Sequence, residues 1–112
     1  MAIITLSSVD DCIAALHVVG LRVFRFTPWS MDIPEGLTAL SEKYPDIKFY
    51  TFSTEDLTDE EDANIFYDCF GFGDVPNVTI CKSGKCVEII AGEMENMDDL
   101  IETTERMIQI HH

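Results

Sequence analysis

The order of predicted strands and helices is the feature that most constrains the fold of this 112-residue chain. Strand-like segments rich in β-branched and aromatic residues alternate with segments whose apolar residues keep a helical spacing. The expected order is strand–helix–strand–helix–strand–helix–strand–strand–helix, with short connections. The chain is therefore expected to form a single α/β domain, in which about four helices flank a mixed β-sheet.

Capping residues, glycine and proline indicate where these elements begin and end. Ser8, Thr58 and Asn96 are expected to cap helices, because short polar side chains accept hydrogen bonds from the free N–H groups of a first helical turn. Gly20 is expected to close the first helix and Pro45 to end the second. Strands are expected at residues 2–6, 21–26, 47–52, 77–81 and 86–90, and helices from about residues 9, 30–34, 59 and 97.

The formal net charge of −14, from 21 acidic and 7 basic residues, restricts the partners of the chain. Nucleic acid is not expected as a ligand, because phosphate contacts need Lys and Arg. An anionic membrane surface is disfavoured for the same reason. An acidic surface that keeps the protein soluble is the simplest interpretation, and a cation-binding module is a weaker alternative. No metal site and no cofactor are predicted.

No targeting or membrane-spanning segment is indicated. No apolar run approaches the ~20 residues that cross a bilayer. Residues 1–5 lack the basic flank and the cleavage site of a signal peptide, so a cytoplasmic location is expected. The domain is expected to span residues 1–110, and residues 111–112, both histidine, are expected to be a tag remnant. The oligomeric state is left open.

The chain contains four cysteines, at positions 12, 69, 81 and 86, and none of them forms a Cys-x-x-Cys pair. The paired short spacings of zinc sites are absent as well. Cys81 and Cys86 flank the predicted hairpin turn, so they can face each other at a distance short enough for a disulfide. Free thiols are expected in a reducing compartment.

Three segments together resemble the thioredoxin family, including its protein disulfide isomerase domains. Residues 23–33 form an apolar strand followed by Pro-Trp, and residues 70–80 resemble the family's Tyr-Gly-Ile-x-x-Ile-Pro-Thr signature. Residues 82–85 and Gly92 follow at the family's hairpin and final-strand positions. The resemblance covers nearly the whole chain and implies a thioredoxin-like three-layer α/β sandwich. It also implies a cis peptide bond at Val75–Pro76.

The chain departs from the family at the residues that carry redox chemistry. The cysteine positions of the family motif hold Ser30 and Ile33, or Thr27 and Ser30 in a second alignment. Phe24 stands where the family keeps a buried carboxylate that moves protons. Dithiol exchange needs one thiolate and a second thiol that resolves the mixed disulfide. We therefore expect no dithiol oxidoreductase activity and assign no catalytic residue.

The rim around the former cysteine positions is interpreted as a partner-binding surface. An exposed tryptophan with apolar neighbours is typical of protein interfaces. We therefore expect a redox-inactive binding or scaffold module whose partner is a protein or an extended peptide. The residues expected to contact the partner are Trp29, Ser30, Met31, Asp74, Val75, Pro76 and Gly92.

A regulatory thiol switch is the alternative from a different functional class. It would use Cys69, which is close in sequence to Pro76, or the pair of Cys81 and Cys86. The acidic composition opposes a reactive thiolate at Cys69.

Arg22 and Arg25, two arginines in the second predicted strand, are also unusual, because a buried guanidinium is expected to need a carboxylate partner. The sequence does not identify that partner.

Overall fold

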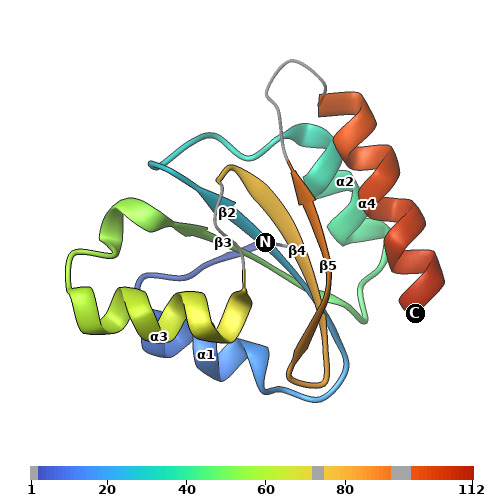
Figure 1. Cartoon of the computed structure of the whole chain (residues 1–112). Coiled ribbons are helices and arrows are strands. Elements are labelled where there is room, and N and C mark those ends of the chain that lie inside the picture. Colours follow the sequence, from blue (N-terminus) through green and yellow to red (C-terminus); the bar gives the residue numbers. More distant parts are fainter. Residues whose placement is uncertain (1–2, 72–74, 92–96) are drawn as a thin grey trace.

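A five-stranded mixed sheet forms the centre of the molecule, with strand order β1-β3-β2-β4-β5 (Figure 1). The computed structural model describes residues 3–71, 75–91 and 97–112. Parallel pairing joins β1 to β3 and β3 to β2, whereas β4 runs antiparallel to β2 and β5 antiparallel to β4. The strands are β1 (Ile3–Thr5), β2 (Leu21–Thr27), β3 (Lys48–Ser53), β4 (Asn77–Lys82) and β5 (Lys85–Ala91).

Two helices cover each face of the sheet (Figure 1). One face carries α1 (Val9–Leu16) and α3 (Glu60–Phe70), and the opposite face carries α2 (Glu35–Lys43) and α4 (Met97–His111). A short 3-10 turn, η1 (Thr54–Asp56), follows β3. The predicted fold class is confirmed: a three-layer α/β sandwich with a mixed sheet and four α-helices.

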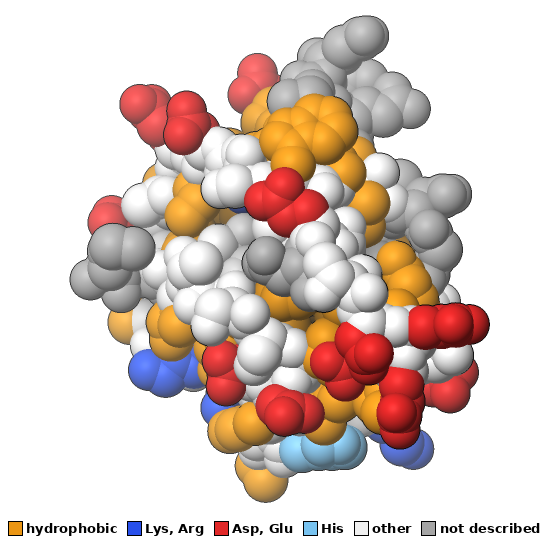
Figure 2. All heavy atoms as spheres, turned by 90° about the vertical axis from the view of Figure 1, so that its left-hand side faces the viewer, with side chains coloured by type: hydrophobic (Ala, Val, Ile, Leu, Met, Phe, Trp, Pro, Cys, Tyr) orange, Lys and Arg blue, Asp and Glu red, His pale blue; other side chains and the backbone are white. Residues whose placement is uncertain are grey.

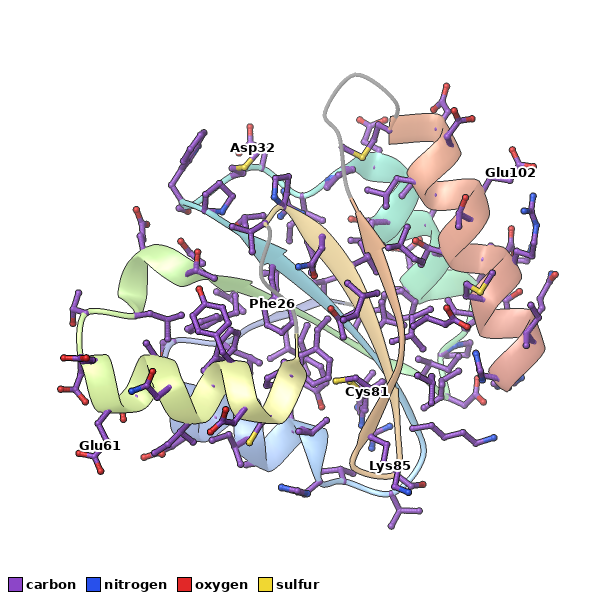
Figure 3. All side chains as sticks on the ribbon, in the orientation of Figure 1. Phe26, Asp32, Glu61, Cys81, Lys85 and Glu102 are labelled. Carbon is purple, nitrogen blue, oxygen red and sulfur yellow. The ribbon has the colours of Figure 1, made fainter. Side chains whose placement is uncertain are left out.

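The core is divided by the sheet into two apolar clusters. Strand β2 is buried along its whole length, so its alternating side chains contribute to both clusters. Phe24 and Phe26 point toward α1 and α3, where their rings stack 5.7 Å apart. Leu21 and Val23 belong to the cluster beneath α2 and α4. Figure 3 shows Phe26 in the layer between the sheet and α3. The second strand is thus the centre of the fold.

Helix boundaries differ from the sequence predictions at three places. The first helix ends at Leu16 instead of Gly20, because Val19 is 82% exposed and β-branched, and so gains no packing from another turn. Asp59 caps α3 in place of Thr58, and its carboxylate accepts a 3.1 Å hydrogen bond from the Asp62 N–H. The predicted Ser8 cap is confirmed, and Asn96 lies outside the described residues.

The third difference is the late start of α2, which begins only at Glu35. Pro34 occupies the cap position with an extended backbone. A proline disfavours helical conformation in the residue before it, so the helix cannot extend back through Ile33. Residues 28–34 therefore connect β2 to α2 without regular secondary structure, and this connection carries the candidate site.

The described residues include no helix long and apolar enough to cross a membrane.

Candidate functional site

The candidate site lies where β2 ends and the chain turns toward α2. Phe26, near the end of β2, pairs with Asn77, the first residue of β4. Val75 and Pro76 directly precede Asn77, so the topology brings them to the same edge of the sheet as the Trp29 segment. The Val75–Pro76 peptide bond is cis, as the sequence resemblance implies. We call residues 28–34 together with Val75 and Pro76 the rim.

Trp29 is the most exposed aromatic side chain on this rim among the described residues, with 57% of its surface accessible. Ser30 is also exposed, and its backbone N–H donates a 3.3 Å hydrogen bond to Glu55 Oε1. Met31, Val75 and Pro76 are half-buried. The rim thus presents one large aromatic side chain beside smaller, partly exposed apolar groups.

Figure 2 shows the face of the molecule that is on the left in Figure 1. Acidic side chains are spread over most of this face, and a group of hydrophobic side chains is exposed among them near its upper edge, at the height of the β2–α2 connection. The two remaining predicted rim residues, Asp74 and Gly92, lie outside the described residues, so their positions add nothing to the geometry of the site.

Arg25 holds the rim segment against the sheet. Its guanidinium donates to the backbone oxygens of Met31 (3.4 Å) and Asp32 (2.9 Å) and to Thr51 Oγ1 (3.4 Å). Only 7% of the residue is exposed, and burial lowers the pKa of Arg25 while the nearby Asp32 charge opposes that shift. These partners are two carbonyls and a hydroxyl, where the sequence predicted a carboxylate. The arginine fixes the middle of the connection, two and three residues after Trp29.

A small pocket of about 100 Å³ opens beside the rim, at the carboxyl ends of the parallel strands β1, β2 and β3. The Ser53 hydroxyl in its wall is buried and has no hydrogen-bond partner among the described residues. Hydroxyl groups dominate the wall. The lining residues are Thr5, Thr27, Ser30, Met31, Ile33, Thr51, Phe52 and Ser53.

Phe24 fills the position at which the resembled family keeps its buried carboxylate. Its side chain is fully buried and packs against the rings of Tyr50 and Phe70, with centroids 5.0 Å and 5.1 Å away. A hydrocarbon ring in this aromatic cluster neither accepts nor donates a proton. The rim, residues 28–34 with Val75 and Pro76, contains no cysteine, and the cysteines nearest to it in sequence are Cys81 and Cys69. Thiol chemistry therefore has no group at the rim itself.

The cysteines lie elsewhere in the fold. Cys12 is fully buried, and burial raises the pKa of its thiol to about 12, with a smaller effect from Asp11. Cys69, near the end of α3, is half-buried against the α1/α3 cluster. Cys81 and Cys86 face each other on β4 and β5, with their Sγ atoms 3.1 Å apart. Within the described ranges, no three His, Cys, Asp or Glu side chains gather as metal ligands would.

Sequence reasoning missed the polar groups that surround the rim. Glu55 comes from η1, a short turn with no local sequence signal. Thr5, Thr51 and Ser53 were not singled out, although each ends or nearly ends a parallel strand. The carboxyl ends of parallel strands lie together at one end of a sheet and commonly form ligand sites. The predicted strand order could therefore have indicated that these three hydroxyl side chains lie near the rim.

The strand order and the position of the rim define the fold as thioredoxin-like. No protein-family model matches the chain, and no curated protein matches it in sequence. Solved structures do match. Thioredoxin NaTrxh from Nicotiana alata is 21% identical with a TM-score of 0.71, over 99% of this chain and 93% of that one. Oxidised thioredoxin O2 from Arabidopsis thaliana is 22% identical with a TM-score of 0.69, over 99% of this chain and 96% of that one.

A designed protein is similar to the same extent, at 23% identity and a TM-score of 0.70 over 94% of this chain and 91% of that one. Likeness at this level of identity establishes a shared fold, and a fold hosts many functions. Function therefore has to be argued from the groups that the site contains.

Proposed function

We propose that this chain is a thioredoxin-fold binding module that recognises an extended peptide segment at its rim and performs no dithiol exchange there. The observation that carries the proposal is Trp29, which is 57% exposed on a connection that Arg25 anchors to the sheet. A large aromatic ring held on a rigid base buries much area at low entropic cost.

The surroundings of Trp29 fit a peptide in extended conformation. Residues 75–76 come directly before β4 at the same edge of the sheet, so a peptide can run beside them and add backbone hydrogen bonds. The hydroxyl-lined pocket of about 100 Å³ lies beside the tryptophan segment and can accept one small side chain. The buried Ser53 hydroxyl offers a hydrogen bond to a polar group there.

The residue types at the rim support binding without redox chemistry. A serine hydroxyl at position 30 forms no disulfide, and isoleucine at position 33 supplies no resolving thiol. Phe24 replaces the carboxylate that would handle protons. The alternative that the sequence leaves open, a thiol switch, has its best-placed groups at the other end of the sheet.

A peptide-binding experiment tests the proposal. Peptides are selected from a displayed random library on the wild-type chain, and their affinities are measured by fluorescence anisotropy. Trp29→Ala should weaken the selected peptides by at least ~2 kcal/mol, about thirtyfold in Kd, as truncation of a central aromatic anchor does. Ser30→Ala should change Kd little, because its contact to Glu55 uses the backbone N–H, which the substitution keeps.

Val19→Ala is the matched control, since Val19 is an apolar side chain that is 82% exposed and lies outside the rim. Its affinity should equal that of the wild type. If Trp29→Ala remains folded and binds the selected peptides as tightly as the wild type does, the binding surface lies elsewhere on the molecule.

A further inference from the structure

Cys81 and Cys86 are two thiols in contact with each other outside the rim. They occupy opposite positions on the antiparallel strands β4 and β5, and their Sγ atoms are 3.1 Å apart. Figure 3 shows Cys81 in the lower half of the sheet, toward the hairpin turn that carries Lys85, whereas Asp32 of the rim lies at the upper edge. The thiols and the rim thus lie at opposite ends of the sheet.

The hairpin geometry sets the two thiols opposite each other. Ser83 and Gly84 both have positive φ, 50° and 90°, as a two-residue hairpin turn requires. Lys82 then pairs with Lys85, and the next pair outward is Cys81 with Cys86. The register of the β4–β5 ladder shifts between Ile80 and Cys81, directly beside this pair. The two side chains still face each other, because their Sγ atoms are 3.1 Å apart, and a small further approach would form a disulfide.

The turn is also held in place from outside the hairpin. The Ser83 N–H donates a 3.1 Å hydrogen bond to the Gly20 carbonyl, and the Gly20 N–H donates a 3.4 Å bond to Ser83 Oγ. These reciprocal bonds tie the turn to the segment that enters β2. Because the turn cannot swing away freely, the two thiols stay in contact range of each other.

The two thiols differ in access and in acidity. Cys81 is 1% exposed, whereas Cys86 is half-buried, packs against the α1/α3 cluster and has its Sγ 3.9 Å from the Cys69 carbonyl oxygen. The hydrogen bond between the two sulfurs lowers the pKa of Cys86 and raises the pKa of Cys81, and burial raises the latter further. Cys86 is thus both the less buried of the two residues and the one more readily present as the thiolate, which is the nucleophile in exchange reactions.

From the sulfur contact and the difference in access, we propose that Cys86 and Cys81 form a thiol–disulfide exchange site that reduces a low-molecular-weight disulfide such as glutathione disulfide. The Cys86 thiolate attacks one sulfur of the substrate, forms a mixed disulfide and releases one substrate thiolate. Cys81 then loses its proton and attacks Cys86 Sγ, which forms the Cys81–Cys86 disulfide and releases the second substrate thiolate. The protein loses two electrons and two protons, and the substrate disulfide becomes two thiols.

This site goes beyond the proposed peptide binding and does not depend on it. Cys81 is five residues after Pro76 along β4, about 17 Å in an extended strand. Neither thiol belongs to the rim or lines its pocket. Either proposal can therefore fail without affecting the other.

Reaction of the full chain with glutathione disulfide, followed by rapid acid quench, alkylation and peptide mass mapping, tests the inference. The wild type should lose two alkylatable thiols, with Cys81 and Cys86 linked in one peptide and little glutathione adduct retained. Cys81→Ala should instead accumulate glutathione on Cys86, because no thiol resolves the mixed disulfide. Cys86→Ala should lose adduct formation at the hairpin, since Cys81 is inaccessible.

Cys69→Ala is the matched control and should leave the Cys81–Cys86 link unchanged. Circular dichroism of each variant confirms that it is folded before its reaction is interpreted. Three results would each overturn the inference: a wild type that keeps all its thiols, a link that involves Cys69 instead, or a Cys86→Ala variant that takes up glutathione at Cys81 as fast as Cys81→Ala does at Cys86.

Discussion

The two ends of the central sheet differ in what they offer a partner. The rim end presents an exposed tryptophan, a hydroxyl-lined pocket and no cysteine in its connecting segment. The hairpin end presents two thiols in contact and a turn that is tied to the neighbouring chain. In this chain, the groups suited to peptide binding and the groups suited to thiol chemistry are therefore separated along β4.

The same two ends differ in how they are held. Backbone pairing between β4 and β5 fixes the hairpin end. The rim connection has no regular secondary structure, and two side chains hold it instead: Arg25 donates hydrogen bonds to its backbone, and Glu55 accepts one from it. Rim geometry therefore depends on individual side chains, whereas the hairpin end depends on the backbone ladder. Point substitutions should consequently disturb the rim more selectively.

The largest expected effect comes from placing the carboxylate of the resembled family at Phe24, in the middle of β2, the strand that leads to the rim. Phe24→Asp removes a fully buried ring from contact with Tyr50 and Phe70 and leaves a carboxyl group without a polar partner. Removal of a buried phenylalanine costs about 3–5 kcal/mol, and burial of the polar group adds to it. The free energy of unfolding should fall by at least ~4 kcal/mol in urea titrations, or the variant should not fold.

Phe24→Leu is the control for this change, because it keeps an apolar side chain in the cluster and should cost at most about 2 kcal/mol. A Phe24→Asp variant as stable as the wild type would mean that the aromatic cluster beneath the rim accommodates a carboxylate. Proton transfer next to the rim would then no longer be excluded by the packing of Phe24.

A smaller effect is expected from Arg25→Met, which removes the anchor of the rim. The substitution deletes hydrogen bonds to Met31, Asp32 and Thr51. Loss of bonds to a charged donor, partly offset by the apolar side chain, should lower the free energy of unfolding by about 2 kcal/mol. The chain contains a single tryptophan, so a change in Trp29 emission reports directly on the rim.

Arg22→Met is the matched variant at the opposite end of the same strand. Arg22 is equally buried and donates to the carbonyls of Leu21 (3.0 Å) and Val19 (3.3 Å). Its replacement should leave the emission of Trp29 unchanged. Equal spectral changes in both variants would show that Arg25 stabilises the fold in general and does not position the rim in particular.

Much of the fold could be predicted from the sequence, because local residues encode several of its elements. These include the β-branched and aromatic residues of β2, the Ser8 cap, and the turn at Ser83 and Gly84. The opposition of Cys81 and Cys86 was predictable for the same reason. The partners of Arg25 were not, since backbone carbonyls of a connection carry no sequence signal. Glu55 reaches the rim because β3 pairs in parallel with β2, so that η1 after β3 lies beside the connection after β2. That pairing is tertiary structure and has no local sequence signal.

The smallest expected effect is on disulfide reduction in a large substrate. The rim has serine and isoleucine where the family has its thiols, and the hairpin thiols lie in a cross-strand pair, with Cys81 only 1% exposed. A folded protein chain reaches such a pair poorly, because attack requires the sulfur of Cys86 to approach a substrate disulfide directly. The reduction of insulin by dithiothreitol, followed by turbidity, should therefore proceed no faster with this protein than without it. Acceleration that Cys86→Ala abolishes would show that the hairpin site acts on proteins as well as on small disulfides. Acceleration that Cys69→Ala abolishes would instead assign the activity to the thiol near the end of α3, whose backbone carbonyl lies 3.9 Å from Cys86 Sγ.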